Sequence, residues 1–139
     1  MIPIDVQNNS LHARIQPTIY DGSNMSSVVN SKVDAIQMIT ILHHVDDPEK
    51  LIRESAQLPD KLIVMEDVYS SSWQELVTHV TDSFVNLEFI GHPHANKTDA
   101  DWKQLFLKNG FELKAFQSDQ FLFFFRQNTY VLKKKNRNN

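Results

Sequence analysis

Apolar and polar positions fall into blocks along residues 33–67, and these blocks predict a strand, a helix and a second strand. Val33–Leu42 is almost continuously apolar, which is typical of a central strand buried on both faces of a parallel sheet. Lys61–Met65 is a second run of this kind. Between them, Asp47 and Pro48 mark a helix start, because an acidic N-cap and a proline at the first helical position both favour that end of a helix. The pattern therefore predicts a βαβ unit with adjacent parallel strands.

Two short apolar segments precede this unit. Met1–Val6 predicts a strand that ends at Asp5, and we expect the chain to begin within this strand. Pro17–Tyr20 predicts a second strand, and Asp21-Gly22 is a turn signal directly after it. Ser23–Lys32 is polar and predicts a loop.

Two further helices are predicted in the second half of the chain. Ser72 and Glu75 have the spacing of a capping box, and apolar positions behind them follow helical spacing as far as Leu87. Thr98 opens the second helix, and Asn109-Gly110 is a typical stop for it.

The last predicted elements are the strands Phe111–Phe116 and Phe121–Leu132, which form an antiparallel pair. Strands that alternate with helices and then close with a hairpin predict an α/β fold with a mostly parallel sheet. We expect residues 1–132 to form this domain. Residues 133–139 carry a basic run and predict a disordered tail.

Composition narrows the function classes. The chain has 139 residues, which suits one domain, and a formal net charge of −3, which disfavours a nucleic-acid partner. It has no cysteine, so disulfides and thiolate metal sites are excluded. No apolar run reaches the roughly 18 residues of a membrane span, and the N-terminus lacks the layout of a signal peptide. We expect a soluble, cytoplasmic protein with no membrane partner.

Histidines and acids gather after the two best-defined strands. His43 and His44 follow the first strand, together with Asp46, and could be metal ligands, members of a structural turn, or catalytic or substrate-lining residues. The two histidines are adjacent rather than spaced on one helical face, and Asp47 is better used as a cap, so we predict no metal site.

The segments DAIQMITILHHVDDPEKLIRESAQL and KLIVMEDV resemble the fourth strand, the Leu-His-His turn, the following helix and the fifth strand of class I S-adenosylmethionine-dependent methyltransferases. The pairs Asp82 with Asn86 and Thr98 with Trp102, followed by Asn109-Gly110-Phe111, are similar to a subgroup of that family. The resemblance covers roughly residues 4–132. It implies a Rossmann-like sheet and S-adenosylmethionine as cofactor.

The resemblance also implies roles for individual residues in cofactor binding. Asp5 matches the acid that holds the ribose hydroxyls of the cofactor, and a carboxylate suits that task because it accepts hydrogen bonds from two donors at once. Asp21, with Gly22 beside it, matches the acid that contacts the adenine. Leu42 matches a residue that lines the cofactor and methyl-transfer site.

Four residues are candidates for a catalytic role. The resemblance implies that His43 and His44 line the methyl-transfer site. Glu66 and Asp67 follow the second strand and would lie on the same edge of the sheet, where they could act in acid–base chemistry or simply end the strand.

The chain departs from the family at its beginning. The family starts with a central strand and a Gly-x-Gly-x-Gly turn, whereas this chain has three glycines, Gly22, Gly91 and Gly110, none near another. We therefore expect the chain alone to bind S-adenosylmethionine weakly or not at all. We also expect a homo-oligomer, most simply a homodimer, or a partner chain that completes the sheet, with the aromatic run Phe121–Phe125 as part of the contact.

Three hypotheses for the function remain. The first is a methyltransferase that acts on an unknown substrate. The second is a catalytically inactive, methyltransferase-derived binding or structural module. The third is one half of a split methyltransferase, whose partner supplies the glycine turn.

Overall fold

The computed structural model describes residues 1–5, 14, 16–21, 24–29, 32–69, 97–121 and 125–135. In chain order its elements are β1 (Ile4–Asp5), β2 (Thr18–Ile19), α1 (Met25–Val28), β3 (Ile36–Ile39), the 3-10 helix η1 (Leu42–His44), α2 (Pro48–Ser55), β4 (Lys61–Val68), α4 (Asp99–Lys108), β5 (Phe111–Phe121) and β6 (Phe125–Lys134). No helix within these ranges is long and apolar enough to cross a membrane.

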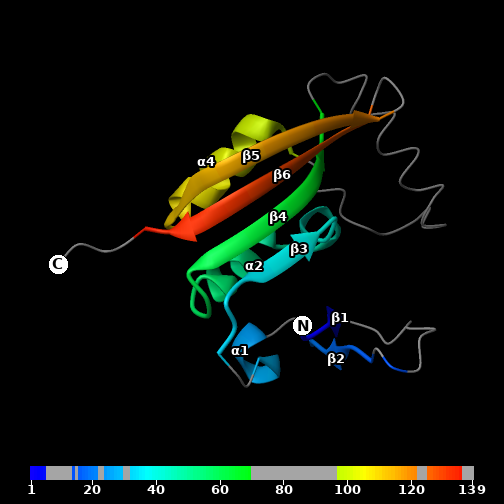
Figure 1. Cartoon of the computed structure of the whole chain (residues 1–139), viewed down its shortest axis with the longest axis vertical. Helices are drawn as coiled ribbons and strands as arrows, with labels where there is room; N and C mark the ends of the chain where they lie inside the picture. Colours follow the sequence, from blue (N-terminus) through cyan, green and yellow to red (C-terminus); the bar gives the residue numbers. More distant parts are fainter. Residues whose placement is uncertain are drawn as a thin grey trace.

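The main sheet has four strands in the order β3-β4-β6-β5 (Figure 1). Strands β3 and β4 are parallel, with Ile36 opposite Leu62 and Ile39 opposite Met65. Strand β6 is antiparallel to both β4 and β5. The predicted α/β class is confirmed, and so are the adjacent parallel strands and the closing hairpin.

A second, two-stranded sheet is formed by β1 and β2, which pair in parallel. The amide of Thr18 donates to the carbonyl of Pro3 at 2.9 Å, and the amide of Tyr20 donates to that of Asp5 at 2.8 Å. Figure 1 shows this pair apart from the four-stranded sheet, on the side where β3 is the outer strand. Ile4 packs against the main core, so both sheets share one hydrophobic interior.

Helices α2 and α4 lie behind the same face of the main sheet in Figure 1. Ile52 of α2 and Trp102 of α4 are fully buried in the core that also contains Val64 and Tyr130 of the sheet. The rings of Phe106 and Tyr130 meet edge to face with centroids 5.2 Å apart. Burial of these apolar side chains is the main force that holds the helices on the sheet.

The prediction of a central strand over Val33–Leu42 is wrong in its length and its burial. Strand β3 spans Ile36–Ile39, and within it only Met38 is buried, while Ile39 is 45% exposed. The reason is that β3 pairs with β4 on one side and with no described strand on the other.

Other boundaries also differ from those predicted. The segment expected to be a loop contains α1, which Asn24 caps by accepting a hydrogen bond from the amide of Ser26. Strand β4 continues past Met65 to Val68, because it pairs with β6 as far as Arg126. Strand β6 continues past Leu132 to Lys134, because Lys133 pairs with Lys61 of β4 and Lys134 pairs with Phe111 of β5. Lys133 and Lys134, assigned to the tail from the sequence, are therefore strand residues.

The predicted helix ends are confirmed. The Asp47 side chain accepts a hydrogen bond from the amide of Lys50 at 2.9 Å. Thr98 and Asp101 form a reciprocal capping box at the start of α4, and Gly110 follows its end with a φ of 83°. The long helix predicted behind Ser72 lies outside the described residues.

Candidate functional site

The turn after β3 begins with an unusual backbone conformation. Thr40 has a φ of 49°, in the left-handed region that β-branched residues rarely adopt. Its amide donates to the carbonyl of Met65 in the neighbouring strand at 2.8 Å. Such a conformation persists only where the surrounding contacts impose it, and it occurs preferentially at functional sites.

Glu66 imposes the rest of this turn. Its Oε1 atom accepts hydrogen bonds from the amides of Ile41 at 3.0 Å and Leu42 at 2.7 Å. The Glu66 side chain is fully buried. A buried carboxylate is costly unless it is hydrogen-bonded, so this one is matched to the two amide donors and fixes where they lie.

The second carboxylate oxygen of Glu66 binds His43. Its Oε2 atom lies 2.5 Å from Nδ1 of His43, and the histidine is only 2% exposed. Because the carboxylate acts as an acceptor towards two amides, we assign the proton of this contact to Nδ1. In the neutral ring, Nε2 is then the basic nitrogen. The His44 ring lies beside the His43 ring, with centroids 4.0 Å apart.

Leu42, predicted to line the cofactor site, is a core residue of the turn. Its side chain is fully buried and its amide is bound by Glu66. Ile41, which was not predicted, is 40% exposed and is the more accessible side chain of the turn.

Glu66 and Asp67 do not form an acid pair. Both lie inside β4 rather than after it, and successive side chains of a strand point to opposite faces. Asp67 is half-buried and its Oδ1 atom accepts a hydrogen bond from Nε2 of Gln127 at 3.2 Å. In the described part of the chain, no group of three or more histidines and acids is placed to hold a metal ion.

Asp5 and Asp21 lie at the carboxyl ends of neighbouring strands. Asp5 is the last residue of β1 and is paired with Ile19, and Asp21 follows two residues later. Both acids are exposed. Because β1 and β2 are parallel, their carboxyl ends meet at one edge. Gly22 lies outside the described residues.

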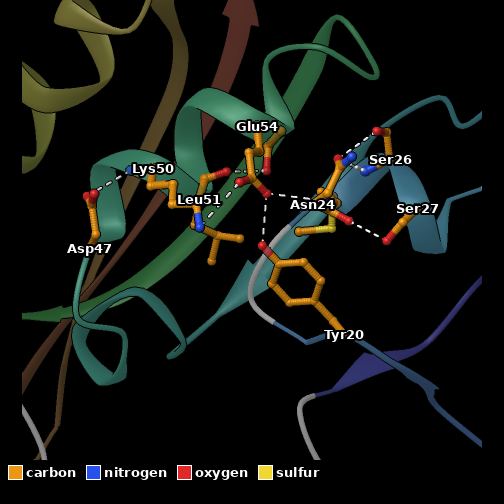
Figure 2. A network of polar contacts seen from close by, with 10 residues as sticks. Tyr20, Asn24, Ser26, Ser27, Asp47, Lys50, Leu51 and Glu54 are labelled. Atoms are coloured by element: carbon orange, nitrogen blue, oxygen red, sulfur yellow. Dashed lines mark hydrogen bonds and ion pairs between the residues drawn. The ribbon is translucent and has the colours of Figure 1, made fainter.

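A hydrogen-bonded contact that was not predicted from the sequence joins the segment next to Asp21 to helix α2 (Figure 2). Oε2 of Glu54, in the last turn of α2, accepts hydrogen bonds from the Tyr20 hydroxyl at 2.8 Å and from the amide of Met25 at 3.0 Å. Burial of the phenol, followed by its hydrogen bond to Glu54, raises the pKa of Tyr20 to about 12. The partners stand 34 and 29 residues apart in the chain, so no local pattern indicates them.

A second unpredicted cluster joins α4 to β6. Oδ1 of Asp99 accepts hydrogen bonds from the Tyr130 hydroxyl and from Nδ2 of Asn128, each at 2.9 Å. Asn128 lies opposite Glu66 in the sheet. Burial raises the pKa of Tyr130 above its usual range. Within the described residues, Oδ1 of Asn128 and Nε1 of Trp102 are buried and have no hydrogen-bond partner.

Comparison by sequence identifies no relative. No protein-family model matches the chain, and no curated protein matches it.

Comparison by structure finds a protein in complex with S-adenosylmethionine and two proteins described as methyltransferases. The chain matches LepI in complex with S-adenosylmethionine with a TM-score of 0.62 and 14% identity, over 91% of this chain and 32% of LepI. It matches magnesium protoporphyrin IX methyltransferase from Synechocystis PCC 6803 with bound S-adenosylhomocysteine with a TM-score of 0.53 and 20% identity, over 86% of this chain and 52% of the enzyme. A putative methyltransferase from Bacillus halodurans C-125 matches with a TM-score of 0.57 and 12% identity, over 73% of this chain and 64% of that protein.

These matches show the fold. The chain has the architecture of class I S-adenosylmethionine-dependent methyltransferases. It spans about a third to just under two thirds of the length of these structures. A shared fold at this level of identity does not fix the reaction, which has to be argued from the site.

Proposed function

We propose that this chain is the cofactor-binding and substrate-binding part of an S-adenosylmethionine-dependent methyltransferase that acts on an unidentified acceptor. The observation that carries the proposal is the position of Asp5 and Asp21, two exposed acids at the carboxyl ends of adjacent parallel strands within a methyltransferase fold. Ligands of open α/β sheets bind at the carboxyl ends of the strands.

The two carboxylates fit the nucleoside part of the cofactor, because they accept hydrogen bonds from its hydroxyl and amino groups. The Asp5 carboxylate would accept hydrogen bonds from the ribose hydroxyls, and Asp21, with Gly22 after it, would contact the adenine side. The chain has no glycine pair for close backbone approach to the rest of the cofactor, so we expect weak binding.

The cofactor, when bound, supplies an activated methyl group on a sulfonium. Transfer then depends mainly on alignment of the acceptor with that methyl, and less on acid–base chemistry. We propose that Glu66 and His43 act as positioning residues, because both are buried and together they hold the turn after β3. His44 is half-buried and stands beside His43, which makes it the histidine placed to meet an acceptor. Asp67 is also half-buried, and it remains a candidate catalytic residue near the carboxyl end of β4.

We further propose that the sheet is completed by another copy of the chain or by a partner chain. Of the two outer strands of the main sheet, β5 carries a bulge at Lys114, whose ammonium lies 2.6 Å from Glu112. Bulges and charges of this kind protect a strand edge from further pairing. Strand β3, with the sequence IQMI, carries neither, and no described strand covers its outer edge.

A second candidate function, an inactive binding or structural module, has its own support. His43 and Glu66 are bound to each other inside the core instead of facing the open edge of the sheet. A turn of this kind stabilises the fold whether or not chemistry takes place beside it.

Calorimetric titration of the chain with S-adenosylmethionine separates the two candidates when Asp5→Ala is titrated in parallel. The proposed function predicts a weak binding signal that Asp5→Ala removes. The inactive-module hypothesis predicts the same absence of signal in both proteins.

A further inference from the structure

One oxygen atom holds both ends of the segment that carries Asp21. Oε2 of Glu54 accepts from the Tyr20 hydroxyl at 2.8 Å and from the amide of Met25 at 3.0 Å. Tyr20 immediately precedes Asp21, and Met25 is the first residue of α1. Figure 2 shows the Tyr20 hydroxyl directed at the Glu54 carboxylate.

The low exposure of Glu54 and Tyr20 strengthens the hydrogen bond between them. Its side chain is 14% exposed, and Nζ of Lys50 on the same helix lies 3.9 Å from its other oxygen. Tyr20 is 9% exposed. Hydrogen bonds to a charged acceptor away from water are stronger than those at an open surface.

The first residue of α2 lies close to the turn after β3 that carries His43 and His44, which we call the histidine turn. Asp47 caps α2 three residues after His44, the last residue of η1. Helix α2 has eight residues, so it is a short, stiff connection between that turn and Glu54. The described residues of β1 and β2 pair only with each other, so α2 relates the acidic edge to the main sheet.

We infer that Glu54 is a positioning residue for a nucleoside ligand: by holding Tyr20 and Met25 it fixes Asp21 relative to the histidine turn, without touching the ligand itself. The inference rests on the proposed function and extends it to a residue of α2. It predicts that loss of the Glu54 carboxylate loosens the Asp21 segment and weakens nucleoside binding, while the core of the protein stays intact.

Three substitutions remove different parts of the contact between Glu54 and its two donors. Glu54→Ala removes both hydrogen bonds. Glu54→Gln retains one oxygen that can accept from both donors, so it should rescue part of the effect. Tyr20→Phe removes only the hydroxyl bond and leaves the Met25 amide bonded. Glu49→Gln is the matched control, because Glu49 lies on the same helix and pairs with Lys108 at 2.9 Å instead.

Amide hydrogen exchange of the full chain tests the positioning directly. We expect the amides of Tyr20, Asp21 and Met25 to exchange at least about tenfold faster in Glu54→Ala, with Glu54→Gln and Tyr20→Phe between it and the parent protein. The amides of the central strand β4 and the control Glu49→Gln should be unchanged. Faster exchange throughout the protein would show that Glu54 only supports packing, and unchanged exchange near Asp21 would overturn the inference.

Titration with S-adenosylhomocysteine, followed by amide chemical shifts, provides the ligand readout. We expect Glu54→Ala to weaken binding by about tenfold or more and Glu54→Gln by less. Equal affinity of the Glu54→Ala and parent proteins would overturn the ligand part of the inference. If the parent protein shows no binding, the proposed function fails and the ligand part with it, whereas the exchange measurement still decides whether Glu54 holds the segment.

Discussion

Nδ1 of His43 and Oε2 of Glu66 lie 2.5 Å apart in the core, although the two residues stand 23 positions apart in the chain. The other oxygen of Glu66 binds the amides of Ile41 and Leu42. A single buried carboxylate therefore fixes the turn that follows β3. The sequence resemblance predicts that residues of this turn line a methyl-transfer site.

Removal of the Glu66 carboxylate should be strongly destabilising. We expect Glu66→Ala to lower the free energy of unfolding by about 3–5 kcal/mol, because two amides and a histidine lose their buried acceptor. Glu66→Gln should lower the free energy of unfolding by less. The glutamine oxygen can still accept hydrogen bonds from both amides, and its NH2 group can donate to Nδ1 of His43 when the histidine carries its proton on Nε2.

Urea denaturation measures both effects, with Asp67→Asn as the control. Asp67 is half-buried, and its Oδ1 atom accepts a hydrogen bond from Gln127 that the amide oxygen of an asparagine can also accept, so we expect Asp67→Asn to change the free energy of unfolding by no more than about 1 kcal/mol. Equal losses for Glu66→Ala and Asp67→Asn would contradict the role assigned to Glu66.

Substitution by glycine should have opposite effects on stability at Thr40 and at Ile39. Thr40 has a φ of 49°, which costs a β-branched residue about 1–2 kcal/mol, so Thr40→Gly should leave stability unchanged or raise it by up to about 1 kcal/mol. Ile39→Gly, in the ordinary extended strand next to it, should lower stability by about 1 kcal/mol or more. Thermal unfolding compares the pair, and a similar loss for both would show that Thr40 carries no strain.

Stability at high pH should depend on Tyr20. Its pKa is raised from 10.0 to about 12 in the folded protein, so the unfolded chain loses the phenol proton first as the pH rises. The contribution of neutral Tyr20 is therefore complete below pH 10 and is lost as the pH rises through about 12.

Urea denaturation at pH 9 and pH 11 should show this loss, and Tyr20→Phe should reduce its size. Tyr130, whose pKa is also raised by burial, should supply the part of the loss that remains. An identical pH dependence in Tyr20→Phe would contradict the assignment.

Association should depend on the outer edge of β3. We expect light scattering to give a mass of twice the 16.1 kDa of one chain if a second copy completes the sheet. Ile39→Lys should favour the monomer, because lysine on a strand edge opposes pairing, whereas Leu113→Lys on the protected strand β5 should not. A monomer mass of the unaltered chain across a wide concentration range would exclude the homodimer.

The aromatic run Phe121–Phe125 remains a predicted part of the contact. Strand β5 ends at Phe121 and β6 begins at Phe125, and residues 122–124 lie outside the described residues.

Local signals in the sequence predicted most of the fold. The Asp47 and Thr98 caps and the apolar run of β4 each depend on neighbouring residues, and the structure confirms them. The length of β3 was overestimated because an apolar run does not show where a turn with positive φ will end the strand, as it does at Thr40.

The candidate site was predicted less completely. Asp5 and Asp21 were proposed because they match acids of the methyltransferase family, and their cofactor role stays a prediction. The role of Glu54 could not be predicted, because it depends on partners about thirty residues away that only the packing of α1 and α2 brings together. Glu66 was expected at an edge of the sheet, and no local pattern indicates that the turn after β3 folds over it.

The most direct test of the proposed cofactor site is a chemical-shift titration of the isotopically labelled chain with S-adenosylhomocysteine. The proposal predicts shifts concentrated at Asp5, Asp21 and the turn from Ile41 to His44, with saturation at about millimolar concentration and loss of the shifts in Asp5→Ala. Micromolar binding would contradict the expectation that the site is incomplete in this chain alone. No localised shifts, or the same shifts in Asp5→Ala, would contradict the site itself.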